Sequence, residues 1–205
     1  MTEIPVGVGL RIAALNQELQ RDPWNVDLLI ELGELYADAG RDPQAIEVLE
    51  RAHALRPPTP PTLHLLGVAC LRTDRLAEAV GWLEAAVQGE PDNIRLVADL
   101  GWAYREAERI SEALETFDRV IRLDPCLTAG YYGRGMCYVS LDDYEEAAGA
   151  LREVVRLDPS DAVARYNLGV CYVVLGDRAA ALEQYREILR VDRNHARLLL
   201  MQIGG

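Results

Sequence analysis

The sequence contains no lysine, so all 21 of its basic residues are arginine. We interpret this bias as the codon usage of a GC-rich, bacterial genome. Acidic residues are more numerous: 33 aspartates and glutamates give a net charge of −12 and a pI near 4.7. A field of this sign repels nucleic-acid phosphates and anionic membrane surfaces. We therefore expect neither nucleic acid nor a membrane surface among the partners.

The composition also excludes a disordered and a membrane-spanning chain. Hydrophobic residues make up 50% of the 205 positions and charged residues 26%, which is typical of a folded protein with a sizeable core. The first fifteen residues contain no basic n-region, and the charged residues Glu3 and Arg11 interrupt their apolar stretch. They do not resemble a secretory signal. We expect a cytoplasmic location and no membrane insertion.

Cysteine is scarce and shows no pairing pattern. The four cysteines form no CxxC pair and have no histidine at metal-ligand spacing, so they are predicted to be core thiols: Cys70, Cys126, Cys137 and Cys171. A P-loop, a dinucleotide-binding fingerprint and a nucleophile elbow are absent as well. We expect no enzymatic activity, no cofactor and no metal ion.

Glycine, by contrast, recurs at a fixed interval of 34 residues, which makes internal repetition the main signal. The glycine column is Gly33, Gly67, Gly101, Gly135 and Gly169. An alanine follows twelve residues later in every copy, at Ala45, Ala79, Ala113, Ala147 and Ala181. A proline closes the first four copies, at Pro57, Pro91, Pro125 and Pro159, and Arg193 takes its place in the last.

Each 34-residue copy has the pattern of two helices. Counted from Val26 as place 1, apolar or small residues at places 4, 7, 8 and 11 form one helical stripe, and places 20, 24 and 27 form a second. Glycine at place 8 and alanine at place 20 allow the two helices to approach closely. The proline at place 32 ends the second helix. Because neither helix can bury its stripe alone, adjacent copies must stack.

This pattern resembles the tetratricopeptide repeat family over residues 26–195. The resemblance implies an all-α fold, a right-handed α-α superhelix of helix-turn-helix repeats. The departures are Cys70 in place of tyrosine, Arg134 in place of leucine and Arg193 in place of proline. The three histidines, His53, His64 and His195, fall in different copies at different places, so no catalytic or metal cluster is expected from them.

The whole chain, residues 1–205, is interpreted as one solenoid. Residues 1–25 are predicted to form an N-terminal capping helix with its connection, because Ile12, Leu15 and Leu19 follow the stripe of a second helix. The five repeats are assigned to residues 26–59, 60–93, 94–127, 128–161 and 162–195. Residues 196–205 are predicted to be a C-terminal helix that resembles a first helix without its partner.

In the resembled family, places 2, 5, 9 and 12 of the first helices line a concave groove that binds peptides. These places are acidic at the start of the chain, at Asp27 and Glu34, with Asp38 beside them. They become apolar and aromatic later. The candidate groove residues are His64, Val68, Arg95, Trp102, Arg105, Tyr132, Met136, Tyr166 and Val170. An alternative is that neighbouring helices cover some of these positions, particularly Val139, Val170 and Val173.

The groove differs from two known types within the resembled family. A clamp for a terminal carboxylate needs lysine and asparagine or arginine at places where Asp27, Ile30 and Glu34 stand here. An asparagine ladder at place 6 is not reproduced either, because Asn167 is the only asparagine in that column. We expect an apolar or amphipathic peptide or helix with some basic residues as the partner.

The C-terminal helix provides a competing surface. It is apolar nearly all round, whereas terminal repeats usually have a polar outer face. It is expected either to mediate self-association or to be followed by further chain; its residues are Leu198, Leu199, Leu200, Met201 and Ile203. The leading hypothesis is a scaffold that binds a partner protein's peptide or helix in the groove. The alternative is a structural protein that oligomerises through this terminal helix.

Overall fold

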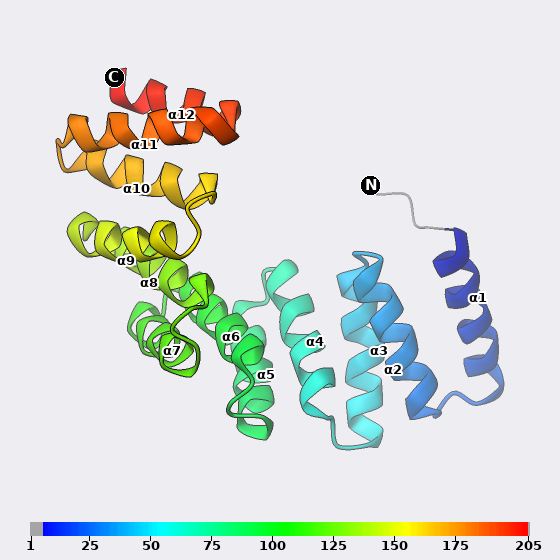
Figure 1. The fold of residues 1–205 in the computed structure, drawn as a ribbon. Helices are drawn as coiled ribbons and strands as arrows, with labels where there is room; N and C mark the ends of the chain where they lie inside the picture. Colours follow the sequence, from blue (N-terminus) through cyan, green and yellow to red (C-terminus); the bar gives the residue numbers. More distant parts are fainter. Residues whose placement is uncertain (1–5, 205) are drawn as a thin grey trace. The chain divides into compact units, whose positions relative to one another are not determined.

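The computed structural model describes residues 6–204, and every regular element in them is an α-helix (Figure 1). These helices divide between two compact units, Met1–Ala107 and Glu108–Gly205. The first unit contains α1 (Val6–Arg21), α2 (Val26–Asp38), α3 (Asp42–Leu55), α4 (Pro60–Arg72), α5 (Leu76–Gly89) and α6 (Ile94–Glu106). The second contains α7 (Ile110–Leu123), α8 (Thr128–Ser140), α9 (Tyr144–Leu157), α10 (Ala162–Val174), α11 (Arg178–Val191) and α12 (Arg193–Gly204).

The first helix of each repeat begins at the residue that the repeat pattern predicts, because a polar residue usually precedes it. The carboxamide of Asn25 accepts a hydrogen bond from the Leu28 amide at 3.3 Å, and Asp161 accepts one from Ala164 at 2.9 Å. These bonds satisfy amide groups that have no partner within the helix. Leu127 stands at the same place before α8 and supplies no side-chain cap.

The predicted close approach of the paired helices is present. A Cβ atom on Gly33 would lie 2.5 Å from the side chain of Leu49, which is fully buried. A closer contact joins successive repeats, because a Cβ atom on Gly133 of α8 would lie 2.2 Å from the ring of Phe117 on α7, which is also fully buried. Glycine therefore makes room at these places for a large side chain of a neighbouring helix.

The turn between the two helices of a repeat has a left-handed residue in every copy. Gly40 and Gly176 have φ values of 66° and 78°. Three acidic residues take the same place in the other copies, namely Asp74, Glu108 and Asp142, with φ values of 61°, 59° and 58°. An acidic side chain in this conformation is strained relative to glycine, so the turn geometry is imposed by the packing of the two helices.

The C-terminal helix begins at Arg193, three residues before the predicted start at residue 196. His195 stands at the place where Asn25 and Asp161 cap other helices. Asp192 takes over this function, because its carboxylate accepts hydrogen bonds from the amides of Asn194 and His195 at 2.8 and 3.2 Å. The helix therefore starts one residue after Asp192.

Three of the four cysteines are buried core thiols, but the prediction is wrong for Cys126, which is exposed in the turn before α8. Burial raises the pKa of the Cys70 and Cys171 thiols to about 11, because removal from water disfavours the thiolate. Both are therefore neutral near pH 7. Within residues 6–204, no helix has both the length and the apolar character needed to cross a membrane.

Candidate peptide-binding surface

In the second unit, four candidate residues lie on α8 and α10, and all four are partly buried: Tyr132, Met136, Tyr166 and Val170. Tyr132 packs against the core cluster around Leu151, and Tyr166 and Val170 pack against the cluster around Leu199. Tyr132, Tyr166 and Val170 therefore each contact the core with one part of the side chain and leave another part accessible to solvent. An arrangement of this kind orients aromatic side chains before a ligand binds.

A hydrogen bond and a ring contact also hold the two tyrosine side chains in place. The carboxamide nitrogen of Asn167 donates a hydrogen bond to the Tyr132 hydroxyl at 3.0 Å. The Tyr166 ring meets His195 edge to face, with the ring centroids 5.8 Å apart. Val139 and Val173 pack against the same core clusters and are also partly buried. The neighbouring helices thus cover part of this face and leave part of it accessible.

In the first unit, the corresponding side chains are more polar. The His64 imidazole nitrogen Nε2 lies 2.6 Å from the Asp99 carboxylate, and its side chain is only 13% exposed. Val68 is partly buried and Arg95 is exposed. The Arg105 guanidinium lies 5.2 Å from the centroid of the Trp102 ring, within the range of a cation–π contact.

The pairs His64–Asp99 and Tyr132–Asn167 share one geometry that the sequence pattern did not reveal. Each joins place 5 of one repeat to place 6 of the next, 35 residues later in the chain. We call these two pairs the rungs. Complementary polar residues at place 5 of one copy and place 6 of the next are the signal by which the sequence could have indicated these contacts.

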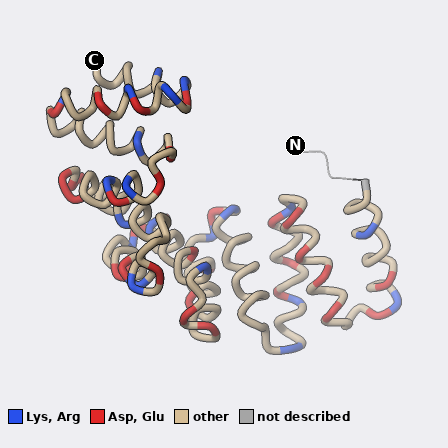
Figure 2. Tube along the Cα trace, in the orientation of Figure 1, with Lys and Arg blue, Asp and Glu red and all other residues tan. Residues whose placement is uncertain are grey.

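The three residues of the predicted acidic entrance are exposed on α2, but they differ in their partners. Figure 2 shows the acidic positions along the chain, those of α2 among them, in red. The Asp27 carboxylate accepts a hydrogen bond from Arg56 at 2.8 Å. Glu34 and Asp38 lie one helical turn apart, and neither has an ion pair or a side-chain hydrogen bond within the described part of the chain. The unpaired negative charge is therefore concentrated at these two residues.

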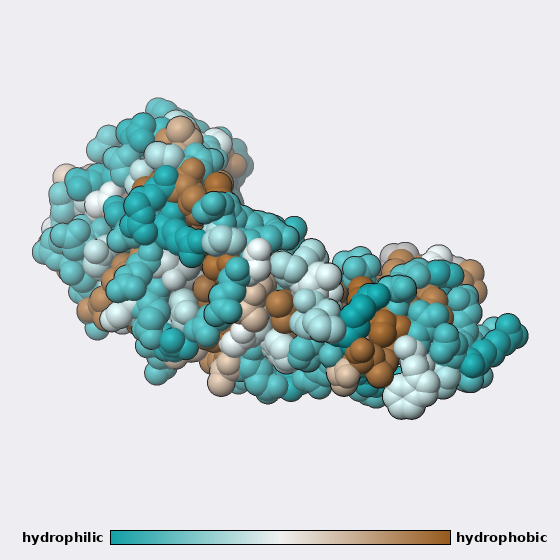
Figure 3. Space-filling view, turned by 90° about the horizontal axis from the view of Figure 1, so that it is seen from below, coloured by the Kyte–Doolittle hydropathy of each residue, from teal (hydrophilic) through white to brown (hydrophobic). Residues whose placement is uncertain are grey.

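The five predicted self-association residues separate into two groups. Leu199 is fully buried and Ile203 is 8% exposed, so both belong to the core of the second unit. Leu198, Leu200 and Met201 are 48%, 46% and 65% exposed. These three large apolar side chains within four positions form a local apolar surface on α12. On the face of the molecule that Figure 3 shows, other apolar patches appear in brown between stretches of hydrophilic surface.

Among residues 6–204, no three histidine, cysteine, aspartate or glutamate side chains gather closely enough to hold a metal ion. Each histidine contacts a different neighbour. His53 meets the Trp82 ring edge to face, His64 contacts Asp99, and His195 contacts Asp192. The histidines do not converge on a common point.

Three models described as tetratricopeptide repeat match the chain. One matches residues 12–66, one matches residues 60–85, and one matches twice, at residues 98–162 and 132–196. The chain belongs to the tetratricopeptide repeat family, whose members are generally non-enzymatic scaffolds for protein interaction. No curated protein matches it in sequence.

Several solved structures share the fold. The structure of MamA residues 41 to the end, from Desulfovibrio magneticus RS-1, has a TM-score of 0.75 at 20% identity and covers 82% of this chain and 96% of its own. A crystal structure of MamA has a TM-score of 0.68 at 24% identity and covers 78% and 99%. YrrB, described as a TPR protein with an unusual peptide-binding site, has a TM-score of 0.68 at 23% identity and covers 89% and 95%.

Proposed function

We propose that this protein is a non-catalytic scaffold that binds a peptide or helix of a partner protein on the exposed face of its first helices. The observation that carries the proposal is the half-buried strip of Tyr132, Met136, Tyr166 and Val170 in the second unit, which contains no charged side chain. Partly exposed aromatic and sulfur-containing side chains held by a core are typical of interface anchors. The peptide-binding site named for YrrB supports the same use of the fold.

The ligand that fits this strip is an amphipathic or apolar segment. Its apolar side would replace water on the tyrosine edges and on Met136, which stabilises the complex by roughly 25 cal/mol per Å² of apolar surface removed from water. Basic residues in the same partner would be attracted to Glu34 and Asp38, the two residues of the acidic entrance that have no partner within the described part of the chain. This attraction acts mainly on the association rate and weakens with salt.

A peptide selected against the protein from a displayed random library tests the proposal. Its dissociation constant would be measured by fluorescence polarisation for the wild type, for Tyr166→Ala and for Met136→Ala. We expect at least tenfold weaker binding for one of them, equivalent to about 1.4 kcal/mol. Leu141→Ala is the matched control, because Leu141 is 53% exposed in the same unit but outside the strip. Unchanged affinity in both strip variants would contradict the proposal.

The charge preference has its own test. Neutralising Glu34 and Asp38 together, as Glu34→Gln and Asp38→Asn, should slow association with an arginine-containing peptide at low salt. The difference should shrink as the ionic strength rises, since exposed charges are screened beyond about 10 Å at 0.1 M salt. Equal association rates for the wild type and this variant at low salt would show that Glu34 and Asp38 do not contribute to binding.

Self-association through α12 is a second candidate function, favoured by the exposure of Leu198, Leu200 and Met201. In this arrangement a second copy would cover the apolar face that the core of the second unit leaves open. Most homo-oligomers are closed and symmetric, so a dimer in which the same face meets itself is the simplest form. A stable interface of this kind buries about 1,200–2,000 Å² in total.

Light scattering at rising protein concentration distinguishes this candidate. Leu198→Glu with Met201→Glu should keep the fold and lower the average mass, because both side chains are exposed. Leu199→Glu is unsuitable, because it would place a charge in the core and unfold α12. A wild-type mass that stays monomeric at every concentration would exclude self-association.

A further inference from the structure

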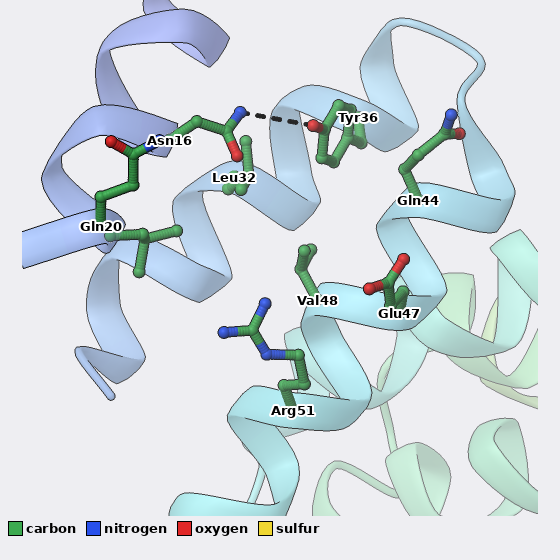
Figure 4. A pocket seen from close by; sticks show the side chains of 9 residues that line it. Asn16, Gln20, Leu32, Tyr36, Gln44, Glu47, Val48 and Arg51 are labelled. Carbon is green, nitrogen blue, oxygen red and sulfur yellow. Dashed lines mark hydrogen bonds between the residues drawn. The ribbon is translucent and has the colours of Figure 1, made fainter. Parts of the chain in front are cut away.

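A cleft lies in the first unit between α1, α2 and α3, apart from the face of the first helices (Figure 4). Its volume is about 300 Å³. Three core side chains form its apolar floor, namely Leu19, Leu32 and Val48, and they are 8%, 1% and 6% exposed. A cleft of this volume is at the lower end of the range that binds small ligands and single side chains.

The next repeat shows what this position can contain. Val48 and Trp82 occupy the same place in successive repeats, as do Leu19 and His53. Trp82 on α5 packs on the core cluster and meets His53 on α3 edge to face, with ring centroids 5.3 Å apart. In the second repeat, an indole ring thus fills the place next to α3 and α5 that corresponds to the open cleft next to α1 and α3. The cleft exists because the first repeat has valine where the second has tryptophan.

Polar groups surround the floor on both sides. Gln20 on α1 and Gln44, Glu47 and Arg51 on α3 form the rim (Figure 4). The side chains of Gln20, Gln44 and Glu47 make no hydrogen bond or ion pair within residues 6–204, whereas Arg51 donates to the Pro23 carbonyl at 3.3 Å. Carboxamides each offer a donor and an acceptor, which matches the amide groups of a peptide main chain.

We propose that this cleft is a second peptide-binding site, which takes an aromatic side chain of a partner segment and pairs with its flanking main-chain amides. The ring lies on Leu19, Leu32 and Val48, as the Trp82 ring lies on its own repeat. Gln20 and Gln44 bind the amides on either side of the aromatic residue. The site does not depend on the strip of the second unit, so either can fail without the other.

The probe for this site is N-acetyltryptophanamide, which carries one indole and two amide groups. Carbon-13-labelled methyl signals of Leu19, Leu32 and Val48 would be followed by NMR during titration of the wild-type protein. We expect saturable shifts confined to these methyl groups, with a dissociation constant in the millimolar range or below, on the order of what a ligand of this size achieves. N-acetylalaninamide should cause no saturable shift. If neither compound shifts these signals, or if both do so equally, the proposal is overturned.

Val48→Trp is the decisive variant, because it fills the cleft with the residue that the second repeat already has. It should abolish binding of N-acetyltryptophanamide, whereas Gln44→Ala should weaken it several-fold. Thr116→Trp is the matched control, since residue 116 occupies the same repeat place on α7 in the second unit. Wild-type affinity in Val48→Trp would overturn the proposal. Should this variant not fold, the methyl shifts of the wild-type protein still decide.

Discussion

The two units build the same rung from different chemistry. In the first unit the rung joins an imidazole to a carboxylate, His64 to Asp99, and in the second it joins a phenol to a carboxamide, Tyr132 to Asn167. The places in the repeat and the spacing along the chain are identical. The repeat therefore determines where two side chains meet, while the choice of residues determines whether the face is polar or apolar. A scaffold can change its partner in this way without changing its fold.

The second unit also contains one close helix contact that the first unit lacks. At place 8 both units set a leucine against the glycine, Leu49 against Gly33 and Leu151 against Gly135. Gly133, at place 6, faces the rigid ring of Phe117 instead. Phe117 is the single phenylalanine of the sequence. The second unit thus adds one large ring, packed against a glycine, to the leucine contacts that both units share.

The largest expected effect is that of Phe117→Ala. Removal of a fully buried ring leaves a cavity, and such changes lower the free energy of unfolding by about 3–5 kcal/mol. Leu83→Ala in the first unit should cost about 2–5 kcal/mol by the same mechanism. Denaturant unfolding followed by circular dichroism measures both. A loss below about 1 kcal/mol for Phe117→Ala would mean that the ring is not the central packing element of its unit.

Substitutions at the glycine contacts should cause the next largest changes in the free energy of unfolding. Gly133→Ala should destabilise by roughly 1–3 kcal/mol, because its Cβ atom collides with a ring that has no room to move. Gly33→Ala should also destabilise, because its Cβ atom would lie 2.5 Å from both Cγ and Cδ2 of the fully buried Leu49. The cost should be smaller than for Gly133→Ala, since an aliphatic side chain can adjust more readily than a rigid ring. Combining Gly133→Ala with Phe117→Leu should recover part of the loss. If the losses in the free energy of unfolding of the two single variants simply add in the double variant, the collision between the Cβ atom and the ring is not the cause of the loss.

The rungs themselves should have smaller effects. Asp99→Ala removes the hydrogen bond between the Asp99 carboxylate and His64. A buried hydrogen bond to a charged group contributes about 1.5–3 kcal/mol to stability. The loss should be smaller here, because the Asp99 side chain is 33% exposed. Asn167→Ala removes a bond between neutral groups, worth about 0.5–1.5 kcal/mol. Thermal unfolding should therefore show the greater loss in the first unit. The reverse order would show that packing against Tyr132, and not the hydrogen bond, is what Asn167 contributes.

The smallest effect concerns the pH dependence of α12. The side chain and the amide of His195 both bind the Asp192 carboxylate and lower its pKa below the ordinary 3.8. A carboxyl group whose pKa is lower in the folded state than in the unfolded state stabilises the fold. The full contribution is present at pH values above the pKa of the unfolded state, and it is lost as the pH falls through the lower pKa of the folded state. Amide exchange at the start of α12 should therefore accelerate below about pH 4 relative to the start of α8, which has no side-chain cap. Asp192→Asn should abolish that difference.

The repeat pattern predicted the all-α superhelical fold, because apolar stripes and small residues act within one 34-residue copy. It was less accurate at the end of the chain, where the cap moved from the place of His195 to Asp192. The reason is that a carboxylate caps a helix better than an imidazole does, so the local competition between two residues set the boundary.

The candidate site, like the fold, could be predicted from the sequence only in part. The sequence alone determined which residues lie on the face of the first helices, since helical periodicity is enough to place them. Only the tertiary structure decided that Arg56 pairs with Asp27, that His64 is nearly buried against Asp99, and that α1 leaves a cleft where Trp82 fills the next one. These features depend on distances between side chains of different helices, and a periodic pattern along one chain contains no such distances.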